Sequence, residues 1–356
     1  MNTIGREYRT TIFGASHGPC VGCLIDGCPP NLRMDMSRIE EEMALRRPKD
    51  LIGTPRREED RVEVIAGVKD GVTTGTPVVM TIPNRDVDSS KYELFSRVPR
   101  PGHADYPALM RYGRAHDIRG GGQFSGRMTA ALVAAGALTR DLLEEIEVEI
   151  GAYTVAIGKV QDREERDMAD ARRARGDPLR AAPEVAEGMR EEILRAREEG
   201  DSVGGVVRCL VEGLPPGIGE PFFDTLDGEM GKMMLSLPGV KGVEFGSGFR
   251  AASMRGSEHN DPYAVRDGTV ITTSNHAGGV LGGLSSGMPL DFRVAFKPTA
   301  SIAREQASVD LTTMRGVPLR IEGRHDPCIV PRAVAVVEAA AALVVADLCV
   351  RGGLIG

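Results

Sequence analysis

Apolar and polar positions along the first part of the chain follow the pattern of β-strands. Residues 8–26 are rich in Thr, Ile, Val and Phe and alternate loosely, and a histidine between glycines predicts a turn within this stretch. Residues 61–68 and 77–82 predict two further strands, and the connection between them carries Gly71 and Gly75. This part of the chain is therefore expected to be mainly strand.

Five segments along the chain carry the pattern of α-helices, the first near residue 36 and the last at the end of the chain. Segments with helical periodicity and end signals are 36–46, about 126–145, 184–199, 222–237 and 331–351. Asp35 or Ser37 is placed to cap the first of them, and Ser125 is placed to cap the second. The last segment is apolar but is interrupted by Glu338 and Asp347, so it predicts a helix buried in the protein, with no membrane span.

The order of these elements limits the fold class. Strands precede and separate long helices without regular alternation, which favours a layered α+β fold over a doubly wound one. At 356 residues, of which 41% are hydrophobic, the chain is long enough for one large domain or two closely packed ones. Residues 161–180 carry dense charge of both signs and are expected to form an exposed loop or a frayed helix.

The overall charge and the local charge point in opposite directions. The net charge of −7 argues against binding of nucleic acid through bulk charge. Residues 97–127 nevertheless carry six arginines and only two aspartates, which indicates a pocket for a small anion. The N-terminal residues lack the pattern of a secretory signal, and six cysteines in a chain of this length fit reduced thiols, so a cytoplasmic protein is expected.

Three histidines are candidates for chemistry because imidazole changes charge near neutral pH. His17, His103 and His325 each lie in a loop marked by Gly or Pro and next to other polar residues. Such histidines also stabilise turns through bonds to the backbone, and spacing alone does not bring the three together. The sequence leaves both interpretations open.

Two further groups have alternative interpretations. His17 with Cys20, Cys23 and Cys28 resembles one half of a zinc site, but no second pair follows at a distance, and free cysteines are often small core residues. We therefore expect no metal. The arginine pair at 46–47 ends a helix, where it either interacts with the helix dipole or clamps a phosphate.

Many segments taken together resemble the chorismate synthase family from end to end. The matching motifs occur in order along the chain: NTIG near the start, FGASHG at 13–18, IDGCPP at 25–30, LRRP at 45–48, TTGTP at 73–77, RPGHADY at 100–106, DIRGGGQFSGR at 117–127, GVKGVEFGSGF at 239–249, RGSEHND at 255–261, SNHAGGVLGGLSSG at 274–287, KPTASI at 297–302 and GRHDPC at 323–328. One such motif would be a weak signal, but this many in order is a specific one.

The resemblance implies a fold and an activity. The family fold is a β-α-β sandwich of the α+β class, with long central helices between antiparallel sheets, here as a single domain over residues 1–356. Its members are homotetramers that act on 5-enolpyruvylshikimate 3-phosphate. They remove phosphate by anti-1,4 elimination to give chorismate, and they require reduced FMN, which some members regenerate with NADPH.

The resemblance also implies roles for particular residues. His17 is expected to act as the acid near the departing phosphate, His103 to control protonation of the flavin, and Asp326 to help accept the proton passed through it. Arg46 is expected to hold the phosphate of substrate or NADPH. The residues expected to contact FMN are Gln123, Phe124, Ser125, Pro238, Gly239, Gly282, Lys297, Pro298, Thr299, Ala300, Ser301 and Arg324.

The chain departs from the common family pattern at a few positions. It has Ala15 where Glu is usual, and Gln123 and Phe124 where many members have Arg and Ser, although a subgroup shares the FSGR sequence found here. An Arg that usually follows the LRRP motif has no clear counterpart. These departures keep open a second hypothesis, a catalytically silent paralogue that binds FMN or substrate, and a zinc-bearing module is a third.

Overall fold

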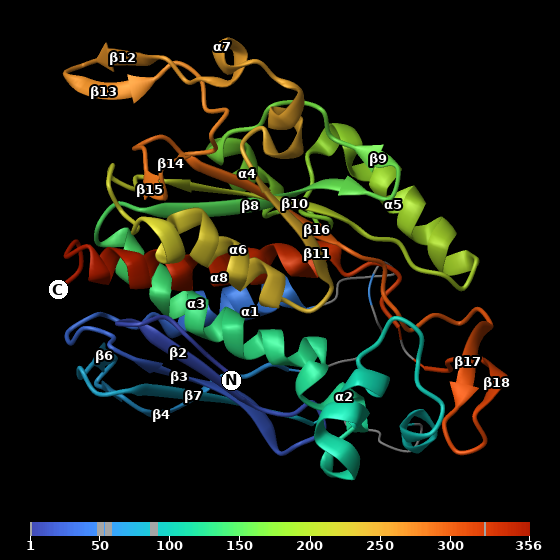
Figure 1. Ribbon diagram of the computed structural model, residues 1–356. Coiled ribbons are helices and arrows are strands. Elements are labelled where there is room, and N and C mark those ends of the chain that lie inside the picture. Colours follow the sequence, from blue (N-terminus) through green and yellow to red (C-terminus); the bar gives the residue numbers. More distant parts are fainter. Residues whose placement is uncertain (1, 48–52, 54–58, 86–91, 324) are drawn as a thin grey trace.

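Two five-stranded antiparallel sheets form the outer layers of the central body, and helices pack between them (Figure 1). The computed structural model describes residues 2–47, 53, 59–85, 92–323 and 325–356. One sheet, in spatial order, comprises β1 (Thr3–Ile4), β2 (Arg9–Gly14), β3 (Cys20–Asp26), β7 (Val78–Pro83) and β4 (Glu63–Ala66). The other comprises β11 (Val240–Phe245), β16 (Leu290–Phe296), β10 (Gly205–Glu212), β8 (Glu149–Ile157) and β9 (Val160–Gln161). The predicted β-α-β sandwich is confirmed.

Long helices fill the space between the sheets, and shorter elements surround this core (Figure 1). The inner helices are α1 (Met36–Arg46), α3 (Thr129–Glu144), α6 (Leu226–Ser236) and α8 (Val330–Arg351). The remaining helices are α2 (Asp105–Tyr112), α4 (Met168–Ala174), α5 (Pro183–Glu198) and α7 (Gly256–His259), with short 3-10 turns η2 (Glu93–Ser96), η3 (Gly113–Ala115), η4 (Arg119–Phe124), η5 (Gly126–Met128), η6 (Phe222–Asp224) and η7 (Gly248–Ser253). Small hairpins pair β5 (Val68–Lys69) with β6 (Val72–Thr73), β12 (Tyr263–Arg266) with β13 (Thr269–Thr272), β14 (Val280–Leu281) with β15 (Leu284–Ser285), and β17 (Gln306–Asp310) with β18 (Arg315–Leu319).

Small residues allow α3 and α8 to approach closely at the centre of the molecule. A Cβ atom added to Gly136 of α3 would lie 2.4 Å from the Cα of Ala339 in α8, so this crossing requires glycine. Among the described residues, α8 is the helix whose length and composition would allow a membrane span, yet 94% of its most apolar stretch is buried. As predicted, α8 is a core helix of the protein.

Several local predictions are confirmed at the level of single residues. The first helix begins at Met36 and ends at Arg46, and the Asp35 carboxylate caps it by accepting the backbone N–H of Ser37 at 2.9 Å. The stretch 8–26 breaks into β2 and β3 around the predicted turn. The helix predicted at 184–199 is α5, in which only Met189 and Ile193 are buried.

Three local predictions are wrong in part, each for a physical reason. Residues 161–180 include the ordered helix α4, because Met168, Ala171 and Ala174 form an apolar stripe hidden among the charges. The helix predicted from about residue 126 begins as the 3-10 turn η5, and α3 starts only at residue 129. The Ser125 hydroxyl caps η5 by accepting the backbone N–H of Arg127. The helix predicted over 222–237 starts at Leu226, where the Thr225 hydroxyl caps it.

Candidate active site

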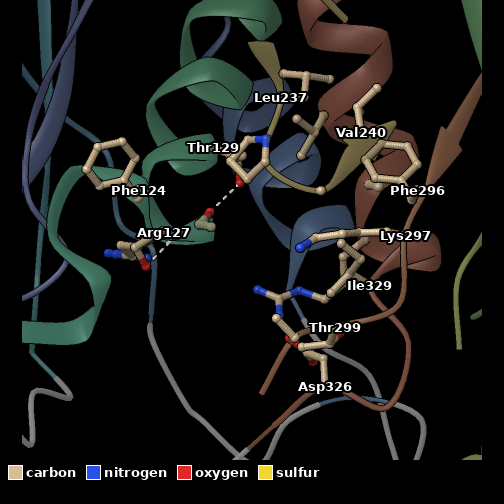
Figure 2. A pocket seen from close by; sticks show the side chains of 18 of the residues that line it. Phe124, Arg127, Thr129, Leu237, Val240, Phe296, Lys297, Thr299, Asp326 and Ile329 are labelled. Carbon is tan, nitrogen blue, oxygen red and sulfur yellow. Dashed lines mark hydrogen bonds and ion pairs between the residues drawn. The ribbon is translucent and has the colours of Figure 1, made fainter. Parts of the chain in front are cut away.

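A cavity of about 650 Å³ opens where the starts of α3 and α8 meet the ends of α1, α6 and β16. We call it the cation-rich cavity, and its wall comprises Arg46, Arg47, Asp60, Gly102, His103, Ala104, Gln123, Phe124, Ser125, Gly126, Arg127, Thr129, Leu235 to Lys241, Phe296 to Ser301, Asp326, Ile329, Arg332, Ala333 and Val336. Figure 2 shows Phe124 and Arg127 on one side of this space and Lys297, Thr299 and Asp326 on the other. Its volume lies within the range of small-molecule sites.

Most of the predicted site residues line this one cavity although they are far apart in the sequence. The ones on its wall are Arg46, His103, Gln123, Phe124, Ser125, Pro238, Gly239, Lys297, Pro298, Thr299, Ala300, Ser301 and Asp326. Arg324 lies outside the described residues. His17 and Gly282 are described but are not on the wall of the cavity.

His17 lies beside the glycine turn that also approaches His103. A Cβ atom on Gly120 would lie 2.3 Å from Cδ2 of His17, and one on Gly121 would lie 3.5 Å from Cε1 of His103. Both glycines have positive φ, +61° and +83° respectively, a conformation that side chains disfavour. Glycine is therefore needed at residue 120 for the close approach of His17.

A single asparagine connects the turn of His17 to the wall of the cavity. The amide nitrogen of Asn84 donates to the backbone oxygens of Ala15 at 2.9 Å and Gly18 at 2.8 Å. Its amide oxygen accepts the Nε–H of Arg127 at 2.8 Å. The turn is therefore held through its backbone at Ala15, where the usual family residue would bring a carboxylate.

His103 belongs to a triad of polar side chains with Arg100 and Asp105 at the start of α2. Arg100 donates to both carboxylate oxygens of Asp105, at 2.8 and 2.7 Å, and its guanidinium lies 4.5 Å from the Phe95 ring centre. Nδ1 of His103 lies 3.1 Å from the same carboxylate and 3.2 Å from Arg100. Burial opposes the charge of Asp105, but the bonds from Arg100 and His103 outweigh it and hold the pKa of Asp105 well below its usual range.

Two buried arginines of the wall share one buried aspartate. Arg46 donates to Asp60 at 2.9 Å, to Thr129 at 3.0 Å and to the backbone oxygen of Gly126 at 3.2 Å, and Arg127 donates to the other oxygen of Asp60. Burial lowers the pKa of Arg46 to about 9, and the nearby charge of Arg332 contributes to the shift. Arg46 thus remains a cation at neutral pH, with three of its N–H donors engaged by the protein.

A second group of charges lines the same cavity. Arg332 donates to the carboxylate of Asp326 at 2.6 Å, and the Lys297 ammonium donates to the backbone oxygen of Gly102. Burial lowers the pKa of Lys297, and the neighbouring Lys241 adds to the effect. Among the described residues of the wall, the cations Arg46, Arg47, Arg127, Arg332, Lys241 and Lys297 face two carboxylates, Asp60 and Asp326. The excess of cations suits an anionic ligand.

Sequence reasoning missed several residues of the wall. Asp60 follows a stretch dense in charge, and nothing in the sequence distinguishes it from its neighbours. Lys241 lies inside the motif at 239–249, but the motif did not single it out as a site residue. Arg332 did carry a signal, because it is a lone cation in the otherwise apolar first turns of α8.

Gly282 lies at the end of α6 that is remote from the cavity. The neighbouring Gly283 accepts the backbone N–H of Leu226 at the start of α6, whereas Leu235 and Leu237 at the other end line the cavity. Its expected contact with the flavin is therefore not supported within this chain, and the contact stays a prediction.

The cysteines near His17 lie in β3 and the turn that follows it. Burial raises the pKa of the Cys23 thiol to about 12 and that of Cys28 to about 11, which disfavours the thiolates that bind zinc. Within the described ranges, no three His, Cys, Asp or Glu side chains are grouped so that they could hold a metal ion. The zinc hypothesis gains no support from this arrangement.

Comparison with known proteins gives one consistent result. The family described as chorismate synthase matches residues 8–350 of the chain. A chorismate synthase of Korarchaeum cryptofilum is 49% identical over 350 residues, covering 98% of this chain and 97% of the relative. One of Dehalococcoides mccartyi is 47% identical over 357 residues, covering 99% and 98% respectively.

A solved structure agrees with the sequence comparisons. A structure titled "Crystal Structure of Chorismate Synthase" superimposes with a TM-score of 0.78 at 28% identity, covering 98% of this chain and 93% of the other. Agreement over almost the full length of both chains assigns the fold to one family. The chain belongs to the chorismate synthase family of lyases, enzymes of the shikimate pathway.

Proposed function

We propose that this chain converts 5-enolpyruvylshikimate 3-phosphate to chorismate and requires reduced FMN to do so. The observation that carries the proposal is the cation-rich cavity, where excess positive charge surrounds His103 and Asp326. In the elimination, the C3–O bond to phosphate and a C6–H bond break, and the ring gains a second double bond. Substrate and product are at the same oxidation level, so the flavin is not consumed.

The residues of the cavity fit FMN. The apolar side chains of Leu237, Val240 and Phe296 offer a surface for a planar ring, and the nearby cations offer partners for a phosphate. The hydroxyl of Thr299 is buried and has no hydrogen-bond partner among the described residues, so it is free to bond a ligand. Bound reduced FMN would supply electron density to the substrate and receive it back within one turnover.

The chain itself would supply charge stabilisation and proton transfer. His17 donates a proton to the departing phosphate, whose developing charge Arg127 and its neighbours stabilise. His103, oriented by Arg100 and Asp105, governs the protonation of the flavin. Asp326 accepts the proton that leaves C6.

Arg46 acts on the phosphate mainly through its charge. Its bonds to Asp60, Thr129 and Gly126 and its exposure of 4% leave little of the guanidinium for direct contact. The same holds for NADPH, toward which Arg46 would contribute positive potential from its buried position in the wall. Reduction of the flavin by NADPH on this chain is a further part of the proposal.

Anaerobic turnover tests the proposed function. The purified chain is supplied with 5-enolpyruvylshikimate 3-phosphate and chemically reduced FMN, without NADPH, and chorismate is followed by its absorbance. We expect chorismate and one equivalent of phosphate. The opposite result, no product from folded protein that binds FMN, would favour the silent paralogue. A parallel assay with oxidised FMN and NADPH tests self-reduction.

We further propose one cytoplasmic domain that assembles as a homotetramer. One hydrophobic core cluster includes both Tyr8 and Ile355, which supports a single domain over residues 1–356. Phe222, Phe223 and Phe249 are 86%, 94% and 88% exposed, and such aromatic surface is typical of protein interfaces. Sedimentation equilibrium should give four times the chain mass of 38.1 kDa.

A further inference from the structure

Arg332 is a residue of the cation-rich cavity that lies outside every motif of the family resemblance. It is in the first turn of α8, and its side chain is 24% exposed. It forms an ion pair with Asp326 at 2.6 Å. Its contacts therefore bear directly on the carboxylate that the proposed reaction uses.

The guanidinium of Arg332 spans two separate parts of the chain. Nη1 donates to the Asp326 carboxylate at 2.6 Å, and Nε donates to the backbone oxygen of Arg46 at 3.0 Å. Arg46 is the last residue of α1, where backbone oxygens have no partner within the helix. One side chain thus bridges the end of α1 and the segment before α8.

We propose that Arg332 is a positioning residue that fixes the Asp326 carboxylate in the cavity by tying it to the end of α1. The proposal rests on the proposed function, in which Asp326 accepts a proton. Asp326 belongs to an irregular segment between β18 and α8, so its backbone alone gives little orientation. Arg332 comes from a buried helix and is anchored through Nε, so its Nη1 presents a donor to Asp326 in a fixed place.

The planar shape of arginine matters for this bridge. A guanidinium presents donors in a rigid fork, so it bonds Asp326 and the carbonyl of Arg46 together. A lysine at residue 332 would keep the charge but could bond only one of the two partners well. Glutamine would lose the charge while keeping a donor.

The test is a double-mutant cycle on turnover with Arg332→Gln, Asp326→Asn and the double variant. We expect Arg332→Gln to lower kcat by about 10- to 100-fold with little change in KM, and Arg332→Lys to recover part of the loss. In the Asp326→Asn background, Arg332→Gln should add less than about twofold. The proposal would be overturned if the losses in kcat of the two single variants multiply in the double variant. It would also be overturned if Arg332→Gln raises KM and leaves kcat unchanged.

A double-mutant cycle on the free energy of unfolding separates this inference from the proposed function. Urea unfolding of the same variants, without flavin or substrate, should show coupling between residues 326 and 332 whether or not the chain is a lyase. FMN affinity, measured by fluorescence quenching, should fall less in Arg332→Gln than in Lys297→Gln, because the charge of Arg332 is already paired with Asp326. No coupling, or lost FMN binding, would contradict the assignment.

The matched control is the ion pair of Arg208 and Asp291 in the second sheet. Its separation of 2.7 Å and the 16% exposure of Asp291 are close to the 2.6 Å and 14% of the Arg332–Asp326 pair, Arg208 is more buried than Arg332 (10% against 24% exposed), and neither residue lines the cavity. Arg208→Gln should show coupling to Asp291 in unfolding while kcat per folded molecule is unchanged. An equal fall of kcat in this control would mark a general structural effect and would overturn the proposal.

Discussion

Two buried ion clusters lie along α1, α3 and α8, and their charge balance differs. In the core ion network, Arg140 and Arg175 bond the carboxylates of Glu42 and Glu338 at 2.5 to 3.3 Å. Glu338 also accepts the backbone N–H of Ala152 at 2.8 Å. Two cations therefore pair with two carboxylates here, and the neighbouring buried Arg180 donates to the backbone oxygens of Arg175 and Asp177. These side chains are bonded within the protein without any ligand.

The cation-rich cavity uses the same kinds of side chain without that balance. Arg46 and Arg127 share the single carboxylate of Asp60, while Lys241 is near enough to Lys297 for its charge to lower the pKa of Lys297. Removing charges from water is costly unless they are paired. The difference indicates that the core ion network serves folding, whereas the cavity holds positive charge for an anionic ligand.

The largest effect should come from removing the proposed acid, His17, or the proposed base, Asp326. His17→Ala and Asp326→Ala should each lower turnover by about 100- to 10,000-fold, the range of general acid–base catalysis, with the fold retained. Chorismate formation and circular dichroism are the measurements. His259→Ala, a histidine of α7 away from the cavity, is the control. Turnover unchanged in the first two variants would refute those roles.

Breaking the core ion network should cost stability and leave the chemistry intact. Glu338→Gln should lower the free energy of unfolding by about 3–5 kcal/mol, because Arg140 and Arg175 would lose a buried partner. Urea unfolding measures this loss. The kcat per folded molecule should match the wild type, and a large fall in kcat at full folding would erase the distinction between the two clusters.

Removing the shared carboxylate of the cavity should lower the stability of the protein, and an added anion should restore part of it. Asp60→Asn leaves Arg46 and Arg127 facing each other and should destabilise the protein by about 3 kcal/mol. Added phosphate should raise the melting temperature of this variant more than that of Glu338→Gln, because an anion replaces the lost charge. Equal responses of the two variants would count against an anion site in the cavity.

The smallest effect concerns acid stability at the start of α2. Because the pKa of Asp105 is held low in the folded protein, its contribution is present above the usual carboxyl range and lost as the pH falls. Asp105→Asn should lose about 1–2 kcal/mol at neutral pH and show a flatter decline in unfolding free energy between about pH 5 and 2. A decline as steep as that of the wild type would contradict this explanation.

The sequence predicted features that depend on neighbours along the chain and on the resemblance. The bounds of α1 and its Asp35 cap follow from local pattern, and the cavity residues His103, Lys297 and Asp326 follow from motifs. Asp60 was missed because its role depends on two arginines that only the fold brings together. Helix α4 was missed because charge concealed its short apolar stripe.

FMN binding compared between two variants tests the central claim most directly. Quenching of flavin fluorescence is measured for the wild type, for Lys297→Gln of the cavity and for Glu338→Gln of the core ion network. We predict one FMN per chain, an affinity about tenfold weaker in Lys297→Gln, and an affinity in folded Glu338→Gln equal to that of the wild type. Equal affinity in all three proteins, or an affinity lost only in Glu338→Gln, would contradict the division between a ligand site and a folding network.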